Sequence, residues 1–213
     1  MSLSGIMIGS TDTLSTYGLF LCADLKIGEP KLKENRVDIP GGNGSLNMSY
    51  SPQGGPVYYD REISFTLAKV MDEASRDSLV STLRNLWHGK EVDLILPNDA
   101  THYWHGILTI GDVSGYNKGL IPVKMIAQPF KLKKTLTTVS KTGAGTVTLS
   151  NERMPAVPTV TSTGAATLAW SGYSVAIEQG EQVIPQLVLP QGDTVVTITG
   201  SATVTFSWRE GSL

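Results

Sequence analysis

Short alternating runs separated by glycine-containing turns fill the last 79 residues of the chain, and they restrict this region to an all-β fold. Seven segments rich in strand-forming residues follow one another here: residues 146–149, 158–161, 166–170, 173–177, 186–189, 193–198 and 203–208. The glycines that separate most of them are Gly164, Gly172, Gly180, Gly192 and Gly200. Short strands with regular turn signals are typical of an antiparallel β-sandwich.

The composition of the chain changes near residue 135, and the change indicates two domains. Residues 135–213 carry eight charged side chains, whereas residues 1–134 carry 28. Each part is long enough to enclose a hydrophobic core of its own. We therefore predict an N-terminal domain over residues 1–134 and a C-terminal β-sandwich over residues 135–213.

The N-terminal domain has alternating segments of its own, so we predict a β-sandwich-like fold. In residues 61–70, Ile63, Phe65 and Leu67 alternate with polar side chains, as in a strand with one buried face. Residues 92–96, 103–113 and 121–127 continue the pattern. The chain as a whole is therefore expected to be mainly β.

One helix is predicted at about residues 72–88. Asp72 is a good N-cap, and Gly89 follows as a candidate left-handed residue after the last turn. The expected apolar stripe consists of Leu79, Leu83, Leu86 and Trp87.

Residues 39–60 are rich in Tyr, Gly and Pro and are predicted to form an extended arm or hairpin. Its candidate contact residues are Leu46, Met48, Tyr50, Val57, Tyr58 and Tyr59. Two interpretations remain open: the arm contacts a neighbouring subunit, or it folds back onto the helix stripe at residues 79–87.

The residue patterns contain no catalytic set, so we expect no enzymatic activity, no catalytic residue, no bound metal and no cofactor. His102 and His105 are three positions apart on a predicted strand, so their side chains point to opposite faces. They are expected to be surface or hydrogen-bonded histidines. The glycine-rich stretch at residues 41–44 does not open a helix, so it does not match a phosphate-binding loop.

The charge, the cysteine count and the hydropathy of the chain argue against nucleic-acid binding, disulfide bonds and membrane insertion. The formal net charge of −2 offers no basic surface for sequence-specific nucleic-acid binding. A single cysteine, Cys22, excludes an internal disulfide framework. The chain has no apolar run long enough to insert into a membrane, and no Lys or Arg precedes Lys26, so no secretion signal is expected.

Aromatic residues of the C-terminal domain suggest a second function, binding of a cell-wall sugar by a lectin-like module. Trp170 and Tyr173 are the candidate sugar or partner contacts, since aromatic rings stack on sugar rings. Whether they lie in the core or on the surface stays open. Trp208 continues the alternation of Val204 and Phe206, so we predict that it is a core residue.

Short motifs spread along the chain resemble those of the distal tail proteins of long-tailed phages (siphophages). They lie at residues 17–19 (Tyr-Gly-Leu), 30–31 (Pro-Lys), 37–41 (Val-Asp-Ile-Pro-Gly), 43–46 (Asn-Gly-Ser-Leu), 59–61 (Tyr-Asp-Arg), 86–90 (Leu-Trp-His-Gly-Lys), 98–99 (Asn-Asp), 103–106 (Tyr-Trp-His-Gly), 128–131 (Gln-Pro-Phe-Lys), 189–193 (Leu-Pro-Gln-Gly-Asp), 198–200 (Ile-Thr-Gly) and 204–211. The resemblance covers nearly the whole chain. One departure is Gly42, where the family's turn is expected to carry Arg.

This resemblance implies a structural virion protein at the distal end of a non-contractile tail, made in the host cytoplasm. Such proteins form a ring, usually a hexamer, whose N-terminal domains stack on the tail tube protein. The other side holds the tail hub or a tail-associated fibre protein. The C-terminal domain is implied to be a galectin-like sandwich that carries receptor-binding proteins where a baseplate exists.

Overall fold

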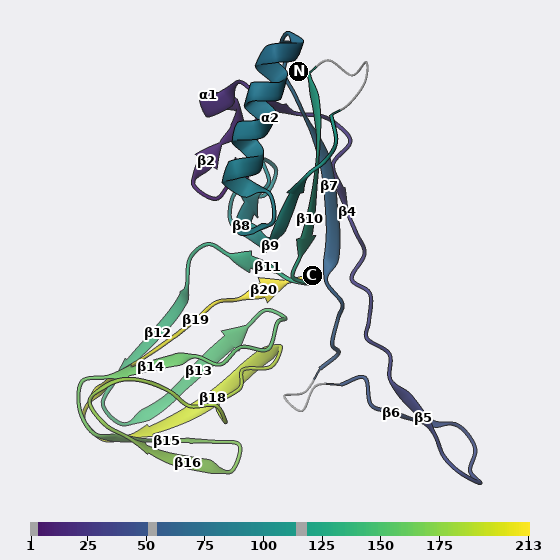
Figure 1. Cartoon of the computed structure of the whole chain (residues 1–213). Coiled ribbons are helices and arrows are strands. Elements are labelled where there is room, and N and C mark those ends of the chain that lie inside the picture. The colour runs from purple at the N-terminus through teal and green to yellow at the C-terminus, as the bar shows by residue number, and fades with distance from the viewer. Residues whose placement is uncertain (1–3, 51–54, 114–118) are drawn as a thin grey trace. The chain divides into compact units, whose positions relative to one another are not determined.

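The computed structural model describes residues 4–50, 55–113 and 119–213, which form a mainly antiparallel β-structure (Figure 1). The chain divides into two compact units. Unit 1 comprises Met1–Lys33 and Tyr58–Lys131, and unit 2 comprises Glu34–Val57 and Leu132–Leu213. The predicted mainly β fold with an antiparallel C-terminal sandwich is confirmed.

A curled antiparallel sheet forms the framework of unit 1. Its strands run in the order β2-β1-β8-β9-β10-β7-β3, and β4 also pairs with β7. The strands are β1 (Met7–Ile8), β2 (Thr11–Asp12), β3 (Phe20–Leu21), β4 (Lys26–Ile27), β7 (Arg61–Ala68), β8 (Lys90–Ile95), β9 (His102–Ile110) and β10 (Leu120–Ala127). The strict alternation of buried and exposed residues along β10 shows that one face of the sheet is covered and the other is open.

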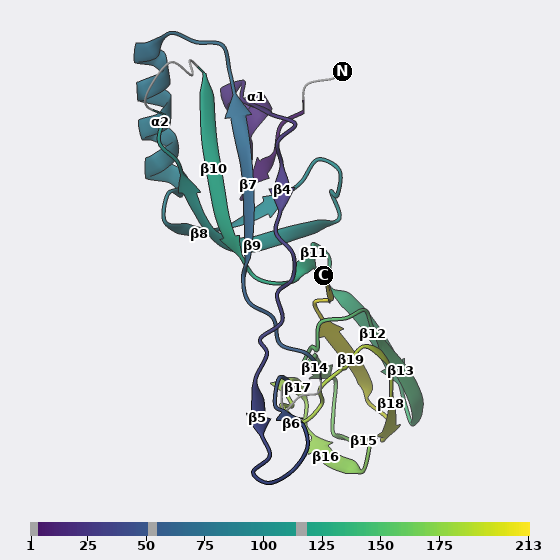
Figure 2. The ribbon, with the colours of Figure 1, turned by 90° about the vertical axis from the view of Figure 1, so that its right-hand side faces the viewer.

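The predicted helix is α2 (Glu73–Trp87), which lies along the covered face of the sheet beside β8 and β9 (Figure 2). The Asp72 side chain accepts a hydrogen bond from the Ser75 backbone N–H at 2.8 Å and so caps the first turn. Gly89 has the expected left-handed backbone, with φ of 74°. The predicted apolar stripe is partly wrong, because Val80 is buried with Leu83 and Trp87, whereas Leu86 is 42% exposed.

A second, short helix was not expected from the sequence. It is α1 (Thr13–Tyr17), a single turn capped by Asp12 and ended by Gly18 in the left-handed conformation. The Thr13 hydroxyl is buried and donates to the Leu19 backbone oxygen at 3.1 Å. Five residues are too few for an apolar periodicity to develop, so the capping residues were the signal available.

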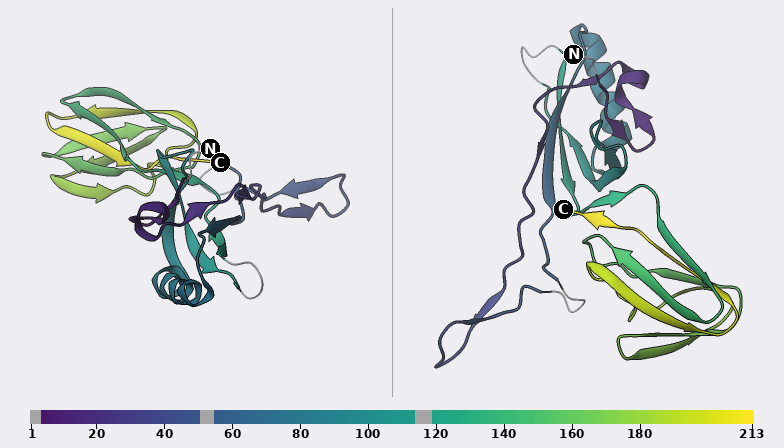
Figure 3. Two further views of the ribbon diagram at one scale, coloured as in Figure 1. Left: turned by 90° about the horizontal axis from the view of Figure 1, so that it is seen from above. Right: turned by 180° about the vertical axis from the view of Figure 1, so that it is seen from behind.

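Unit 2 contains a two-stranded hairpin and the sandwich (Figure 3). The hairpin pairs β5 (Arg36–Asp38) with β6 (Ser45–Asn47), and Val37 lies opposite Leu46. Its connection uses Gly41 and Gly44 with positive φ angles, which suit residues without a Cβ atom. The hairpin thus begins before residue 39, the predicted start of the arm.

The sandwich consists of two four-stranded antiparallel sheets, β12-β19-β14-β17 and β13-β18-β15-β16. The strands are β12 (Thr137–Thr142), β13 (Gly145–Asn151), β14 (Thr159–Ser162), β15 (Ala166–Trp170), β16 (Tyr173–Ile177), β17 (Gly180–Val183), β18 (Gly192–Thr199) and β19 (Thr203–Trp208). β11 (Lys131–Lys133) pairs with β20 (Gly211–Ser212). Both sheets contribute side chains to one hydrophobic core, which includes Phe206 and Trp208. Trp208 is therefore a core residue, as predicted.

One predicted strand of the sandwich is wrong. Residues 186–189 form no strand, and their place is taken by β17, which pairs with β14. Leu187 and Leu189 are fully buried, which explains why the segment resembles a strand in the sequence. Pro185 and Pro190 enclose the segment, and proline cannot donate a backbone hydrogen bond to a neighbouring strand.

Candidate functional site

The hairpin β5–β6 and the segment that follows it display five apolar side chains to solvent. Val37, Ile39, Leu46, Met48 and Tyr50 are each between 47% and 60% exposed. Apolar side chains gathered on one element are a feature of surfaces that bind another protein. Val37 and Ile39 are not among the contact residues predicted from the sequence, although Asp38 separates them and so sets up an alternation.

Two backbone hydrogen bonds of Asn35 hold the base of this hairpin. The Asn35 backbone N–H donates to the Ser49 hydroxyl at 2.8 Å, and the Met48 N–H donates to the Asn35 carbonyl at 2.8 Å. Ser49 is buried, although its neighbours Met48 and Tyr50 are exposed. The backbone of the hairpin is therefore fixed without burial of its apolar side chains.

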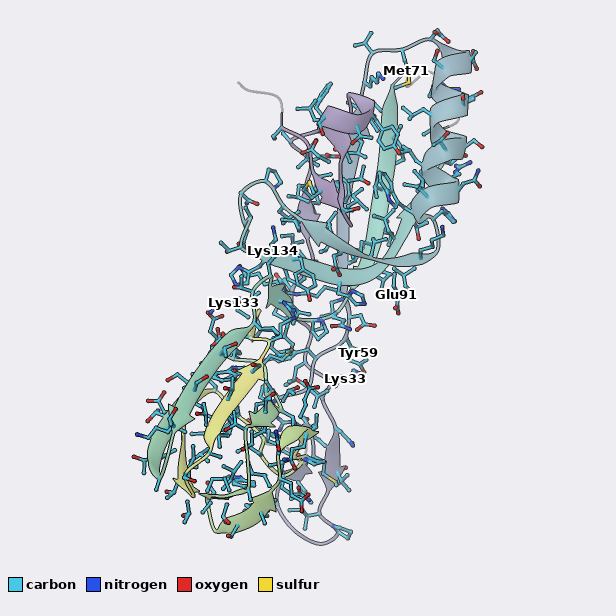
Figure 4. All side chains as sticks on the ribbon, turned by 90° about the vertical axis from the view of Figure 1, so that its left-hand side faces the viewer. Lys33, Tyr59, Met71, Glu91, Lys133 and Lys134 are labelled. Carbon is cyan, nitrogen blue, oxygen red and sulfur yellow. The ribbon has the colours of Figure 1, made fainter. Side chains whose placement is uncertain are left out.

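Three of the six predicted contact residues, Val57, Tyr58 and Tyr59, follow the hairpin in the sequence. Val57 is half-buried and its N–H donates to the Ser49 carbonyl, whereas Tyr58 and Tyr59 belong to unit 1. The Tyr58 ring packs edge-on against Phe130 at 5.7 Å between ring centroids. Tyr59 is 53% exposed, and the Lys33 ammonium lies over its ring at 5.2 Å (Figure 4). Of the six predicted contact residues, Leu46, Met48, Tyr50 and Val57 thus belong to unit 2, and Tyr58 and Tyr59 belong to unit 1.

The buried apolar side chains of helix α2 pack against the hydrophobic core of unit 1. Val80, Leu83 and Trp87 pack with sheet residues such as Leu108 and Ile110 in one cluster. Among the described residues, that cluster includes no member of the arm.

Trp170 and Tyr173 lie next to each other at the turn between β15 and β16. Trp170 is 5% exposed and Tyr173 is 52% exposed, and their rings stack at 5.6 Å with 23° between the planes. Ser171 and Gly172 both have positive φ angles, as in the tight turn of a two-residue hairpin. The pair therefore closes this hairpin, and burial of the Trp170 ring limits its access to a sugar.

The two histidines of β9 make separate contacts with carboxylates. His102 Nδ1 lies 2.9 Å from Asp99 Oδ1, and His105 Nδ1 lies 2.8 Å from Asp93 Oδ1. As predicted, both are hydrogen-bonded. Within residues 4–50, 55–113 and 119–213, no group of three His, Cys, Asp or Glu side chains is arranged to hold a metal ion.

The surroundings of Asp99, in the turn before β9, lower its pKa. Burial by itself raises the pKa of Asp99, but hydrogen bonds from Lys131, His102 and Thr101 outweigh burial and hold the pKa well below its ordinary value. The Lys131 ammonium is 2.7 Å from Asp99 Oδ2. These contacts attach the turn before β9 to the end of unit 1, which is a structural role.

A further negative finding concerns membranes. In the part of the chain that the structure describes, we find no helix of the length and hydrophobicity that crossing a bilayer requires.

The chain was compared with protein families, with curated proteins and with solved structures. No family model matches the chain, and no curated protein matches its sequence. The fold of the chain, however, has a match among solved structures. It is similar to the crystal structure of SPP1 Dit (gp 19.1), with a TM-score of 0.65 and 17% sequence identity. The likeness covers 98% of this chain and 99% of that one.

SPP1 Dit is described as a paradigm of the hub adsorption apparatus in phages that infect Gram-positive bacteria. The resemblance to distal tail proteins is confirmed at the level of the fold. At 17% sequence identity, this likeness shows a shared fold.

Proposed function

We propose that this chain is a structural protein of a long non-contractile phage tail. The observation that carries the proposal is the likeness to SPP1 Dit, which includes both units and leaves almost no part of either chain unmatched. A fold shared over two units is more specific than a single shared sandwich, since sandwiches occur in proteins of many functions. The role is assembly and attachment rather than catalysis.

In this proposal the chain forms a ring, with six copies as the expected number, at the distal end of the tail. One side of the ring contacts the tail tube protein, and the other holds the tail hub or a tail-associated fibre protein. Receptor-binding proteins are further partners where a baseplate exists. Residues 1–134 would build the ring, and residues 135–213 would form the outward module.

The hairpin provides a physical basis for contact between copies. Its exposed apolar side chains, Leu46 and Met48 among them, gain free energy when a neighbour removes them from water. A contact between different surfaces of identical chains closes into a ring when the rotation between copies returns to the start. A short hairpin with a fixed base suits such a head-to-tail contact, because little backbone entropy is lost on binding.

The location in the virion can be tested with particles of the phage that encodes the chain. Gold-labelled antibody against the purified protein is expected to mark one position per particle, at the tail end distant from the capsid. Label along the whole tail, on the capsid or on no particle would contradict the proposal.

The role of the hairpin can be tested separately. The double variant Leu46→Ser and Met48→Ser is expected to dissociate the ring without loss of the folded structure. Val195→Ser is the matched control, because Val195 is a similarly exposed apolar residue on the sandwich. Dissociation by the control, or an intact ring in the double variant, would place the subunit contact elsewhere.

A further inference from the structure

A regular array of hydroxyl groups covers the outer face of one sandwich sheet. Across β12 and β19, three pairs of side-chain oxygens lie within hydrogen-bond distance: Thr138–Ser207 at 3.3 Å, Ser140–Thr205 at 2.9 Å and Thr142–Thr203 at 2.9 Å. These positions alternate along each strand with residues of the opposite face, such as Val204 and Phe206. Every outward position on these two strands is thus a serine or a threonine.

The neighbouring strand β14 extends the array. Thr159 is in register with Ser207, and Thr161 is in register with Thr205. Strands in a sheet are about 4.8 Å apart, and alternate residues along a strand are about 7 Å apart. The eight side chains, which we call the hydroxyl face, therefore form rows at regular spacing on three adjacent strands.

The eight side chains of the hydroxyl face are short and uncharged. In register beside Thr159 and Thr161 on β17 lie Val183, which is 59% exposed, and Glu181. Surface positions on strands commonly carry Lys, Glu or Arg, which protect a sheet from unwanted contacts. Short side chains also lose little conformational entropy when a ligand covers them.

We propose that the hydroxyl face binds an extended, neutral polysaccharide. A hydroxyl group donates one hydrogen bond and accepts others, so each pair still has a donor and acceptors to offer a ligand. Threonine also presents a methyl group next to its hydroxyl, as a sugar ring presents C–H groups next to its O–H groups. The lack of charge within the rows favours a neutral polymer over an anionic one.

The proposed surface differs from the one expected from the sequence. Trp170 is buried, and the hydroxyl face belongs to β12, β19 and β14, not to the sheet that contains Trp170. The proposal also does not depend on a ring. One copy is expected to bind weakly, because each hydrogen bond to a ligand replaces one to water, and repeated copies on one particle would add avidity.

The test is retention of the full-length protein on insoluble chitin, on cellulose and on an array of neutral glycans. The variant Thr161→Val with Thr205→Val removes two neighbouring hydroxyls from the face. Valine has nearly the shape of threonine and favours strands, so the fold is kept. Loss of two hydrogen bonds is expected to lower the affinity by about tenfold or more.

Two comparisons make the result specific. Thr148→Val with Thr197→Val changes two exposed threonines of the other sheet and is expected to bind like the unchanged protein. Thr205→Ser keeps the hydroxyl and is expected to retain most of the binding. The proposal is overturned if no neutral glycan retains the protein, or if both double variants bind equally. It is also overturned if the hydroxyl-face variant changes only self-association.

Discussion

Replacement of Gly106 by alanine is expected to destabilise unit 1 strongly. Gly106 lies in β9 opposite Ala127 of β10, where the two backbones approach closely. A Cβ atom added to Gly106 would lie 2.2 Å from the Ile126 carbonyl oxygen and 2.6 Å from the Ala127 Cα. Both atoms belong to the backbone of a strand that is hydrogen-bonded on both sides, so neither can move as a side chain can.

The size of the effect follows from the overlap. Non-bonded atoms prefer separations of about 3.5 Å, so the strands would have to separate locally by roughly 1 Å. Overpacking of this kind costs about 3 kcal/mol when the core cannot relax. For a unit of this size, that cost lowers the midpoint of thermal unfolding by about 10 °C.

Differential scanning calorimetry of the full chain measures this change, with Gly164→Ala as the control. An added Cβ at Gly164 meets only the Ala202 Cβ, at 3.7 Å, an ordinary contact. The control is expected to match the unchanged protein within about 1 kcal/mol. An unfolding midpoint for Gly106→Ala within about 2 °C of the unchanged protein would refute the reasoning from backbone overlap.

Four further substitutions have distinct expected outcomes. Asp99→Asn is expected to lower the free energy of unfolding at pH 7 by about 1 kcal/mol, measured in urea. Because folding lowers the pKa of Asp99, its contribution to stability is complete above the ordinary carboxyl pKa and is lost as the pH falls from there through the lowered pKa. A urea series from pH 6 to pH 2 should therefore show a smaller loss of stability in Asp99→Asn than in the unchanged protein. Trp170→Ala is expected to destabilise unit 2 by about 3–5 kcal/mol, and Tyr173→Ala by about 1 kcal/mol, in the same urea assay; equal effects would contradict the different burial of the two rings. Ser171→Asn is expected to raise the free energy of unfolding by about 0.5 kcal/mol, and with it the melting temperature, since asparagine tolerates a positive φ better than serine. A lower melting temperature would argue against the turn geometry.

The elements that could be predicted from the sequence are those long enough for the pattern of apolar residues to repeat several times. Helix α2 has four turns and a capping aspartate, and β10 has eight residues in strict alternation, so each pattern repeats often enough to be recognised. Leu86 and Val80 show the limit of such patterns. They lie on neighbouring sides of one helix, and the position of the sheet decides which of them is buried.

The hydroxyl face could not be predicted because it depends on register between strands that are distant in sequence. Thr138 and Ser207 are 69 residues apart, and only the pairing of β12 with β19 brings them together. The sequence also did not predict β12, because its outward residues are polar and Val139 is the single apolar residue among its inward ones. The exposure of Leu46 and Met48, in contrast, is a property of one hairpin, so the local pattern was sufficient to select them.

Assembly of identical chains is the central expectation for this protein, and the mass of the purified full-length protein in solution tests it directly. Light scattering after size exclusion, over a series of protein concentrations, is expected to give a mass close to six times the 22.8 kDa of one chain. Electron microscopy of that species should then show a ring with a central opening. A mass of one chain at every concentration, up to the limit of solubility, would contradict self-assembly through the exposed hairpin.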